Sequence, residues 1–161
     1  MFRLTADEWR SIDGIGEEAV ALLMPRAEHV VTRAALTFAN AIKRTLTGRR
    51  TGTPVKVTKD GKSKRHIPSR PGEPPAVLFG NLRNSVGANR AQTVGYIVFA
   101  EVGVGLGVKP KGGAHDPATT YARRLERGGV DKRGVRILPR PYIEPTETAV
   151  AAKLDAILET L

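Results

Sequence analysis

Four prolines within eight residues, at positions 68, 71, 74 and 75, divide the chain near its middle. Proline lacks a backbone N–H, fixes its own φ and disfavours a helical residue before it. The stretch SRPGEPPA, residues 69–76, therefore cannot continue a helix or the interior of a sheet. We expect a stiff, extended segment here, with turns at Gly72 and Gly80 between the stiff parts.

The residues before the prolines predict a long helix and then a hairpin. Pro25 either kinks a helix over residues 16–46 or marks the first turn of its longer half. Val55 and Val57 alternate with polar residues around Asp60-Gly61, which is typical of a β-hairpin. Neither face of this hairpin can bury much, so we expect it to project from the body. The apolar residues that share one face of the helix are Val31, Ala34, Phe38, Ile42 and Leu46.

Positive charge is concentrated around this hairpin. The chain has a formal net charge of +10, and residues 43–70 carry ten basic side chains and one acidic one, a net +9. Clustered cations on a projecting element suit a phosphate backbone or an acidic protein surface. No aromatic residue lies between Phe38 and Phe79, so base stacking by this segment is excluded. The cations assigned to it are Arg49, Arg50, Lys56, Lys59, Lys62, Lys64 and Arg65.

The residues after the prolines predict a small antiparallel sheet and two helices. Residues 78–88 indicate a helical turn leading into a strand, with Leu82 in the core, and residues 93–108 indicate one or two strands with a bulge or turn at glycines. A short helix should end at Gly128, and residues 144–160 should form an amphipathic helix after an extended stretch. We therefore predict one α+β domain over residues 1–161, with residues 47–76 as an extended basic and proline-rich arm.

Residues that support catalysis or metal binding are sparse. His29, His66 and His115 are scattered, and His115-Asp116 is the one suggestive pair. The glycines of GVGLG, residues 103–107, are not followed by the helix that a phosphate loop needs, which favours a flexible strand end. The chain has no cysteine, which excludes disulfides and thiol catalysis. We expect no enzymatic activity, cofactor, metal or small-molecule substrate.

The sequence shows no membrane or export signal. No apolar run approaches the length of a membrane span, and the N-terminal residues lack the apolar core of a signal peptide. We therefore expect an intracellular protein at synthesis, with no membrane partner.

Three segments, in order, resemble one family. SRPGEPPAVLFGNLRNSV is similar to Ser-x-Pro-Gly-x-Pro-Pro-Ala followed by Thr-Gly-x-Leu-x-x-Ser-Ile; YARRLERGG is similar to Tyr-Ala-x-x-Leu-Glu-x-Gly; LPRPYIEPTETA is similar to Pro-Ala-Arg-Pro-Phe-Leu-x-Pro-Ala. These patterns are those of the neck, or head-to-tail joining (tail completion), proteins of long-tailed double-stranded-DNA phages and prophages, whose distant relatives include the minor tail protein Z of phage lambda. The likeness covers roughly residues 20–161, with Phe79 and Arg127 departing from the usual Thr and Phe.

This resemblance implies a non-enzymatic structural protein of the virion. Such α+β subunits form a ring, of six or twelve copies, where the connector of the filled head meets the tail. The implied partners are copies of the chain and other neck, connector or tail-terminator proteins. The implied location is the virion neck, with the host cytoplasm during assembly.

The stiffness of the prolines gives a physical reason to place an interface on them. Proline lowers the entropy lost when a segment is immobilised against a neighbour. An ordinary surface loop is the alternative. We also expect Arg140 to pair with an acid such as Glu126. The residues assigned to a subunit or partner interface are Arg70, Pro71, Gly72, Pro74, Pro75, Arg140, Pro141 and Tyr142.

The basic arm has two placements in such a ring. Facing the channel, it would attract DNA weakly and in a salt-dependent way. Gripping an acidic rim, it would bind little DNA and become ordered over residues 47–67 with its partner. We favour the second, because a channel that bound DNA tightly would slow DNA exit. The competing functions are a small nucleic-acid-binding module acting through the Arg/Lys-rich hairpin and a host-interacting or regulatory prophage protein.

Overall fold

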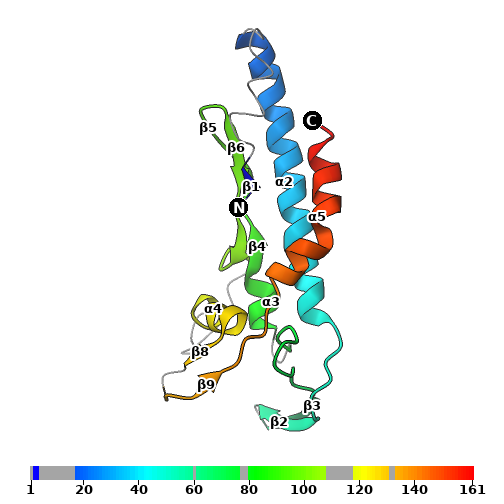
Figure 1. Ribbon diagram of the computed structural model, residues 1–161, viewed down its shortest axis with the longest axis vertical. Coiled ribbons are helices and arrows are strands. Elements are labelled where there is room, and N and C mark those ends of the chain that lie inside the picture. Colours follow the sequence, from blue (N-terminus) through cyan, green and yellow to red (C-terminus); the bar gives the residue numbers. More distant parts are fainter. Residues whose placement is uncertain (1, 4–16, 60, 77–79, 108–117, 131–132) are drawn as a thin grey trace.

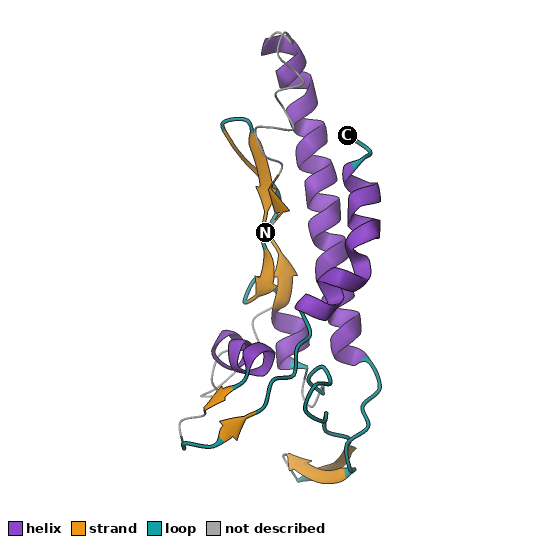
Figure 2. Ribbon diagram, viewed as in Figure 1, coloured by secondary structure: helices purple, strands orange, loops and turns teal. Residues whose placement is uncertain are grey.

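The computed structural model describes residues 2–3, 17–59, 61–76, 80–107, 118–130 and 133–161. Its elements confirm the α+β class and the predicted order, and Figures 1 and 2 show their arrangement. They are β1 (Phe2–Arg3), α2 (Glu17–Thr47), β2 (Val55–Lys59), β3 (Lys62–His66), α3 (Asn81–Ser85), β4 (Val86–Ala88), β5 (Gln92–Val94), β6 (Ile97–Ala100), β7 (Val102–Val104), α4 (Ala118–Arg127), β8 (Gly129–Val130), β9 (Arg136–Ile137) and α5 (Glu144–Leu158).

Helix α2 is the central element. It lies between the strands β4 to β7 on one side and α5 on the other (Figure 1). Pro25 lies inside this helix, eight residues after its start, so it does not mark the first turn. The predicted buried face is confirmed, because its members are only 1–5 % exposed: Val31, Ala34, Phe38, Ile42 and Leu46.

Two apolar clusters hold other elements to α2. The first joins Ile42 and Leu46 of α2 to Val86 of β4 and Leu154 of α5. The second joins Val31 of α2 to a different set of buried residues, which lie between β4 and the end of β6: Ala91, Val98 and Ala100. Leu82 packs against the first cluster, as predicted. The strands and α5 are thus stabilised by one helix.

The strands on α2 form two antiparallel sheets, β4–β7 and β1–β6–β5, which follow one another along the chain and are together called the ribbon here. Ala88 lies opposite Val102 and Gln92 lies opposite Phe99, so one extra residue sits between the two pairs on the β4–β5 side. This is a β-bulge. The sequence predicted one or two strands with a bulge or turn at glycines. The turn is confirmed at Gly95, which has a φ of +61° and lies between β5 and β6, whereas the bulge falls outside the glycines. The edge strand β1, which pairs with β6, was not predicted.

The glycine run after β7 is closely packed rather than flexible. The N–H groups of Gly105 and Gly107 both donate to the carbonyl oxygen of Ser85, at 2.8 and 2.9 Å. A side chain at Gly107 would collide with the backbone of residues 84–86. The run is a strand end, as expected, but its glycines allow close approach of two backbones.

Two smaller predictions are confirmed in the second half of the chain. Helix α4 ends where Gly128 adopts a φ of +75°, and α3 leads directly into β4. The two-residue pairing of β8 with β9 was not predicted. His115, Asp116 and Phe79 lie outside the described residues.

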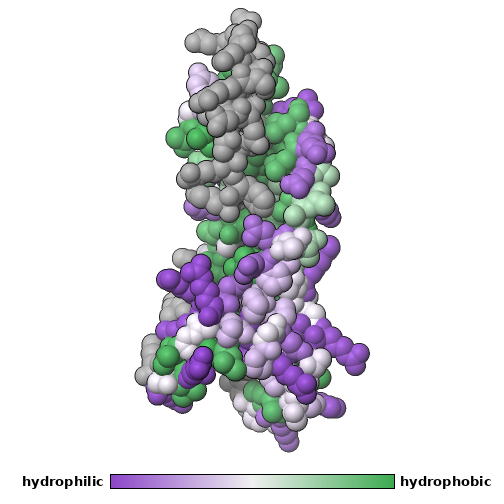
Figure 3. Space-filling view, viewed as in Figure 1, coloured by the Kyte–Doolittle hydropathy of each residue, from purple (hydrophilic) through white to green (hydrophobic). Residues whose placement is uncertain are grey.

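Three general features of the described structure bear on what the chain can bind. On the face drawn in Figure 3, hydrophilic side chains cover much of the lower half, the end from which the arm extends. None of the helices described here combines the length and apolar character needed to cross a membrane. Among the described residues, no three His, Asp or Glu side chains are grouped closely enough to hold a metal ion.

The role of α5 in the core can be tested with two leucines. Leu154 is 1 % exposed in the first cluster, whereas Leu36 of α2 is 49 % exposed. Leu154→Ala is expected to lower the free energy of unfolding by about 2–5 kcal/mol, because it leaves a cavity between α2 and α5. Leu36→Ala, the matched control, should change it by less than about 0.5 kcal/mol. Urea denaturation measures both, and equal effects would contradict this packing.

Candidate partner interface

Residues 50–52 and 68–75, here called the arm base, fix the basic hairpin to the body. Arg50 lies just after α2, and its Nη2 donates to the carbonyl oxygens of Thr45 (2.8 Å), Leu46 (3.1 Å) and Pro75 (3.0 Å). Carbonyls at a helix C-terminus have no partner within the helix, and a cation there is favoured by the helix dipole. Arg50 therefore ends α2 and ties the proline segment to it.

A carboxylate also links the two segments of the arm base through hydrogen bonds. Glu73 accepts hydrogen bonds from the N–H of Arg70 at 2.9 Å and from the hydroxyl and N–H of Thr51. The Thr51 hydroxyl, and next the Arg70 N–H, lower the pKa of the Glu73 carboxyl below its ordinary value. The ionised Glu73 thus joins the two segments of the arm base, residues 50–52 and 68–75.

Backbone bonds complete the arm base. The N–H of Gly52 donates to the carbonyl oxygen of Pro68 at 3.1 Å, and a side chain at position 52 would collide with that oxygen. Gly72 has a φ of +85° and donates its N–H to the carbonyl oxygen of Pro139 at 3.0 Å. The first and third family-like segments therefore touch through this bond.

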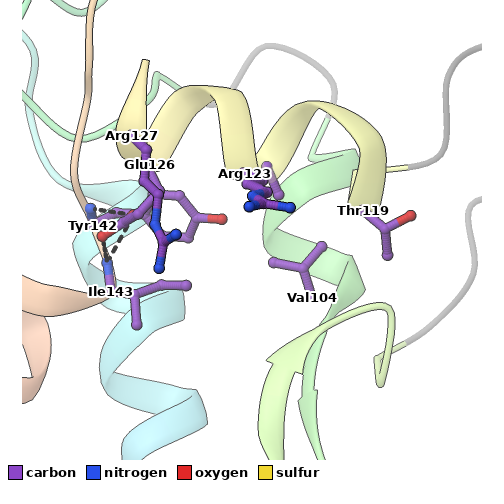
Figure 4. Close-up of a pocket in the computed structure, with 8 residues that line it drawn as sticks. Val104, Thr119, Arg123, Glu126, Arg127, Tyr142 and Ile143 are labelled. Atoms are coloured by element: carbon purple, nitrogen blue, oxygen red, sulfur yellow. Dashed lines mark hydrogen bonds between the residues drawn. The ribbon is translucent and has the colours of Figure 1, made fainter. Parts of the chain in front are cut away.

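The second family-like segment meets the third at the start of α5. Figure 4 shows the Glu126 carboxylate accepting from backbone N–H groups. The donors are Tyr142 at 2.9 Å and, at 3.2 Å, Ile143 and Glu144. A carboxylate is favoured at a helix N-terminus, where N–H groups are unpaired. Arg140, which we expected to pair with Glu126, instead donates its backbone N–H to Leu125 at 2.6 Å.

The predicted interface residues divide by burial. Arg70, Pro71 and Gly72 are exposed, whereas Pro74, Arg140 and Pro141 are half-buried. Two of them face the interior of the isolated chain, because Pro75 is buried and Tyr142 is 0 % exposed within the first cluster. Sequence spacing alone could not show that these residues face inward.

The predicted basic arm projects, with one correction. Strands β2 and β3 pair with each other and have only marginal contact with the other described elements. Figure 1 shows them beyond the C-terminal end of α2. Arg50 differs from the other predicted cations, because its guanidinium faces inward at the arm base. The side chains of Lys59 and Lys64 lie outside the described part, and the exposed cations are Arg49, Lys56, Lys62 and Arg65.

Glu73 was missed by sequence reasoning, and Glu126 was assigned the wrong partner. Both act on backbone N–H groups, and Glu126 lies sixteen to eighteen residues before its partners in the sequence. The one local signal was the acid three residues after Arg70 in a Pro-Gly turn, which is a common place for a carboxylate to accept a backbone bond.

Comparison of the chain with protein-family profiles, curated proteins and solved structures gave no significant match. The resemblance to neck proteins therefore rests on the three segments alone.

The arm base should depend on the charge of Glu73. Glu73→Gln is expected to weaken its bonds to Thr51 and Arg70, because a neutral amide accepts weaker hydrogen bonds than a carboxylate. Amide exchange at Thr51 and Arg70, followed by NMR, should accelerate. Glu147→Gln, an exposed position on α5, is the matched control and should leave both amides unchanged.

The same interaction predicts a pH dependence. The pKa of Glu73 is lower in the folded chain than in the unfolded chain. Its stabilising effect is therefore complete above the ordinary glutamate pKa, about 4.3, and is lost as the pH falls through the lowered folded-state pKa. An NMR titration that gave Glu73 an ordinary or raised pKa would contradict this geometry.

Proposed function

We propose that this chain is a structural subunit of a tailed-phage or prophage virion, which forms a ring at the junction of head and tail. The three family-like segments suggest this class of structural virion protein. The observation that carries the proposal is the arm: a charged hairpin held at a fixed base, which has only marginal contact with the other described elements. Such an element can reach a neighbouring subunit in a ring.

The hairpin is destabilised by its own charges. The exposed Lys56 lies directly opposite the exposed Arg65. Like charges at such positions repel each other, and an isolated two-stranded hairpin is marginal in water. An anionic surface would relieve this repulsion, so the arm is suited to bind one.

An apolar strip on the hairpin favours a protein as that surface. Val55 and Val57 alternate with Lys56 and so lie on the opposite face, where Val55 is 44 % exposed. Ile67, directly after β3, is also exposed. Burying these side chains gains nothing from a phosphate backbone, whereas a protein surface can cover them. We therefore favour an acidic protein over DNA.

The chain carries an acidic surface of this kind on α5. Residues 144–159 include four acids and one lysine. Three of these acids, Glu147, Asp155 and Glu159, recur at multiples of four and are exposed, so they form a stripe. Asp155 and Glu159 lie at the C-terminal end of α5, where the helix dipole disfavours anions. Cations from a neighbouring copy would offset this unfavourable placement of the two anions.

Two different complementary surfaces on one chain give a head-to-tail contact. The basic hairpin of one copy binds the α5 stripe of the next, and such contacts close into rings when the rotation permits. Contacts of this kind between exposed charges weaken as salt rises. The exposed segment Arg70-Pro71-Gly72 lies in the arm base, shortly after β3 in the sequence, and extends the same contact.

Charge reversal tests this contact. The variant Lys56→Glu, Lys62→Glu, Arg65→Glu is expected to remain monomeric where the native chain assembles, because its arm repels α5. Adding Glu147→Lys, Asp155→Lys and Glu159→Lys should restore assembly, since the two charge patterns are then exchanged. Sedimentation velocity at low and physiological salt measures both. The control reverses three exposed arginines elsewhere, Arg83, Arg90 and Arg136.

Three results would contradict the proposal. The native chain could stay monomeric at all concentrations, the arm variant could assemble as well as the native chain, or the six-fold variant could fail to recover. A measurement of DNA affinity distinguishes this proposal from the alternative function, which is nucleic-acid binding by the hairpin. Micromolar or tighter DNA binding near physiological salt, lost in the arm variant, would assign the arm to nucleic acid.

A further inference from the structure

A hollow of about 500 Å³ lies beneath α4. Its apolar wall is formed by Val104, Ala122 and Ile143, and its polar rim includes Arg123 and Arg127 (Figure 4). Ligand sites in proteins have this size and this combination of an apolar wall with a few polar groups. The hollow is formed within one chain, so its chemistry is independent of the proposed ring.

The hydroxyl of Tyr142 is left without a partner at this hollow. Figure 4 shows the ring of Tyr142 extending beneath α4, with its oxygen directed toward the space below Arg123. The residue is 0 % exposed, and its hydroxyl has no hydrogen-bond partner among the described residues. Buried hydroxyls are nearly always bonded, because an unpaired one loses its hydration without compensation. This oxygen therefore indicates a missing partner.

The surroundings define the chemistry of that partner. Burial, and next the Glu126 carboxylate, raise the pKa of the Tyr142 hydroxyl, so it stays protonated and can donate. The partner must therefore accept a hydrogen bond. The Glu126 carboxylate is occupied by three N–H groups of the α5 start, whereas Arg123 and Arg127 hold exposed guanidinium groups at the rim. An anionic acceptor suits this arrangement.

We propose that the hollow binds a carboxylate carried on a short apolar chain. The carboxylate accepts the proton of the Tyr142 hydroxyl in a hydrogen bond and pairs with the guanidinium of Arg123, while the apolar chain covers Val104 and Ile143. The hydroxyl itself is buried, so a carboxylate reaches it only when neighbouring side chains shift. A free small acid and a glutamate side chain of a neighbouring protein both supply this chemistry.

The test uses the full chain and two probes. Hexanoate is titrated while the amide signals of Ala122, Arg123 and Ile143 are followed by NMR, and hexanamide is the uncharged match. A blocked Leu-Glu-Leu peptide is the second probe. Saturable binding of hexanoate alone identifies a free acid, and saturable binding of the peptide identifies a protein side chain.

Tyr142→Phe removes only the hydroxyl. It is expected to leave the free energy of unfolding unchanged or higher, because the oxygen has no partner in the part of the chain that the structure describes, and to weaken carboxylate binding by roughly tenfold. Arg123→Gln, at an exposed position, should also weaken it, and Arg90→Gln, exposed on the ribbon, should not.

The inference is overturned if neither probe shifts these signals at tens of millimolar. It is also overturned if hexanamide binds as tightly as hexanoate, or if Tyr142→Phe binds the carboxylate as tightly as the native chain does.

Discussion

Four alanines lie on the buried side of α2, at positions 27, 34, 35 and 39, and they let the strands and α5 approach one helix closely. Larger side chains on the same helix, among them Ile42 and Leu46, fill the space where β4 and α5 meet. Because α3, the ribbon and α5 all pack on α2, each is positioned by the same surface. A change of volume along this face would displace the elements that carry both proposed contacts.

Two charged side chains fix the arm base and the start of α5 relative to this core. Arg50 bonds the last carbonyls of α2 and the proline segment, so the arm base keeps a fixed place relative to the core. Glu126 bonds the first N–H groups of α5 and so joins α4 to the helix that carries the acidic stripe. The same bonds hold Tyr142 under α4. The helix termini, rather than further apolar packing, therefore connect the core to the surfaces that we assign to function.

The sequence predicted what local spacing controls. The repeat from Val31 to Leu46 identified the buried face of α2, because helix geometry alone places those residues together. The hairpin around Gly61 followed from alternation and turn chemistry in the same way. The inward direction of Arg50 and the burial of Tyr142 were not predictable, since both depend on partners far along the chain. The strand β1 was missed because two residues carry no pattern.

The central claim is that a fixed arm base supports a hairpin whose order depends on a partner. Amide hydrogen exchange on the isolated chain tests it most directly. We predict that the amides of Gly52 and Gly72 exchange slowly, close to those of β4 and β7. The amides of β2 and β3 should exchange much faster, because the hairpin has only marginal contact with the other described elements and its facing Lys56 and Arg65 repel each other. Hairpin amides as protected as those of α2, or unprotected amides at Gly52 and Gly72, would contradict it.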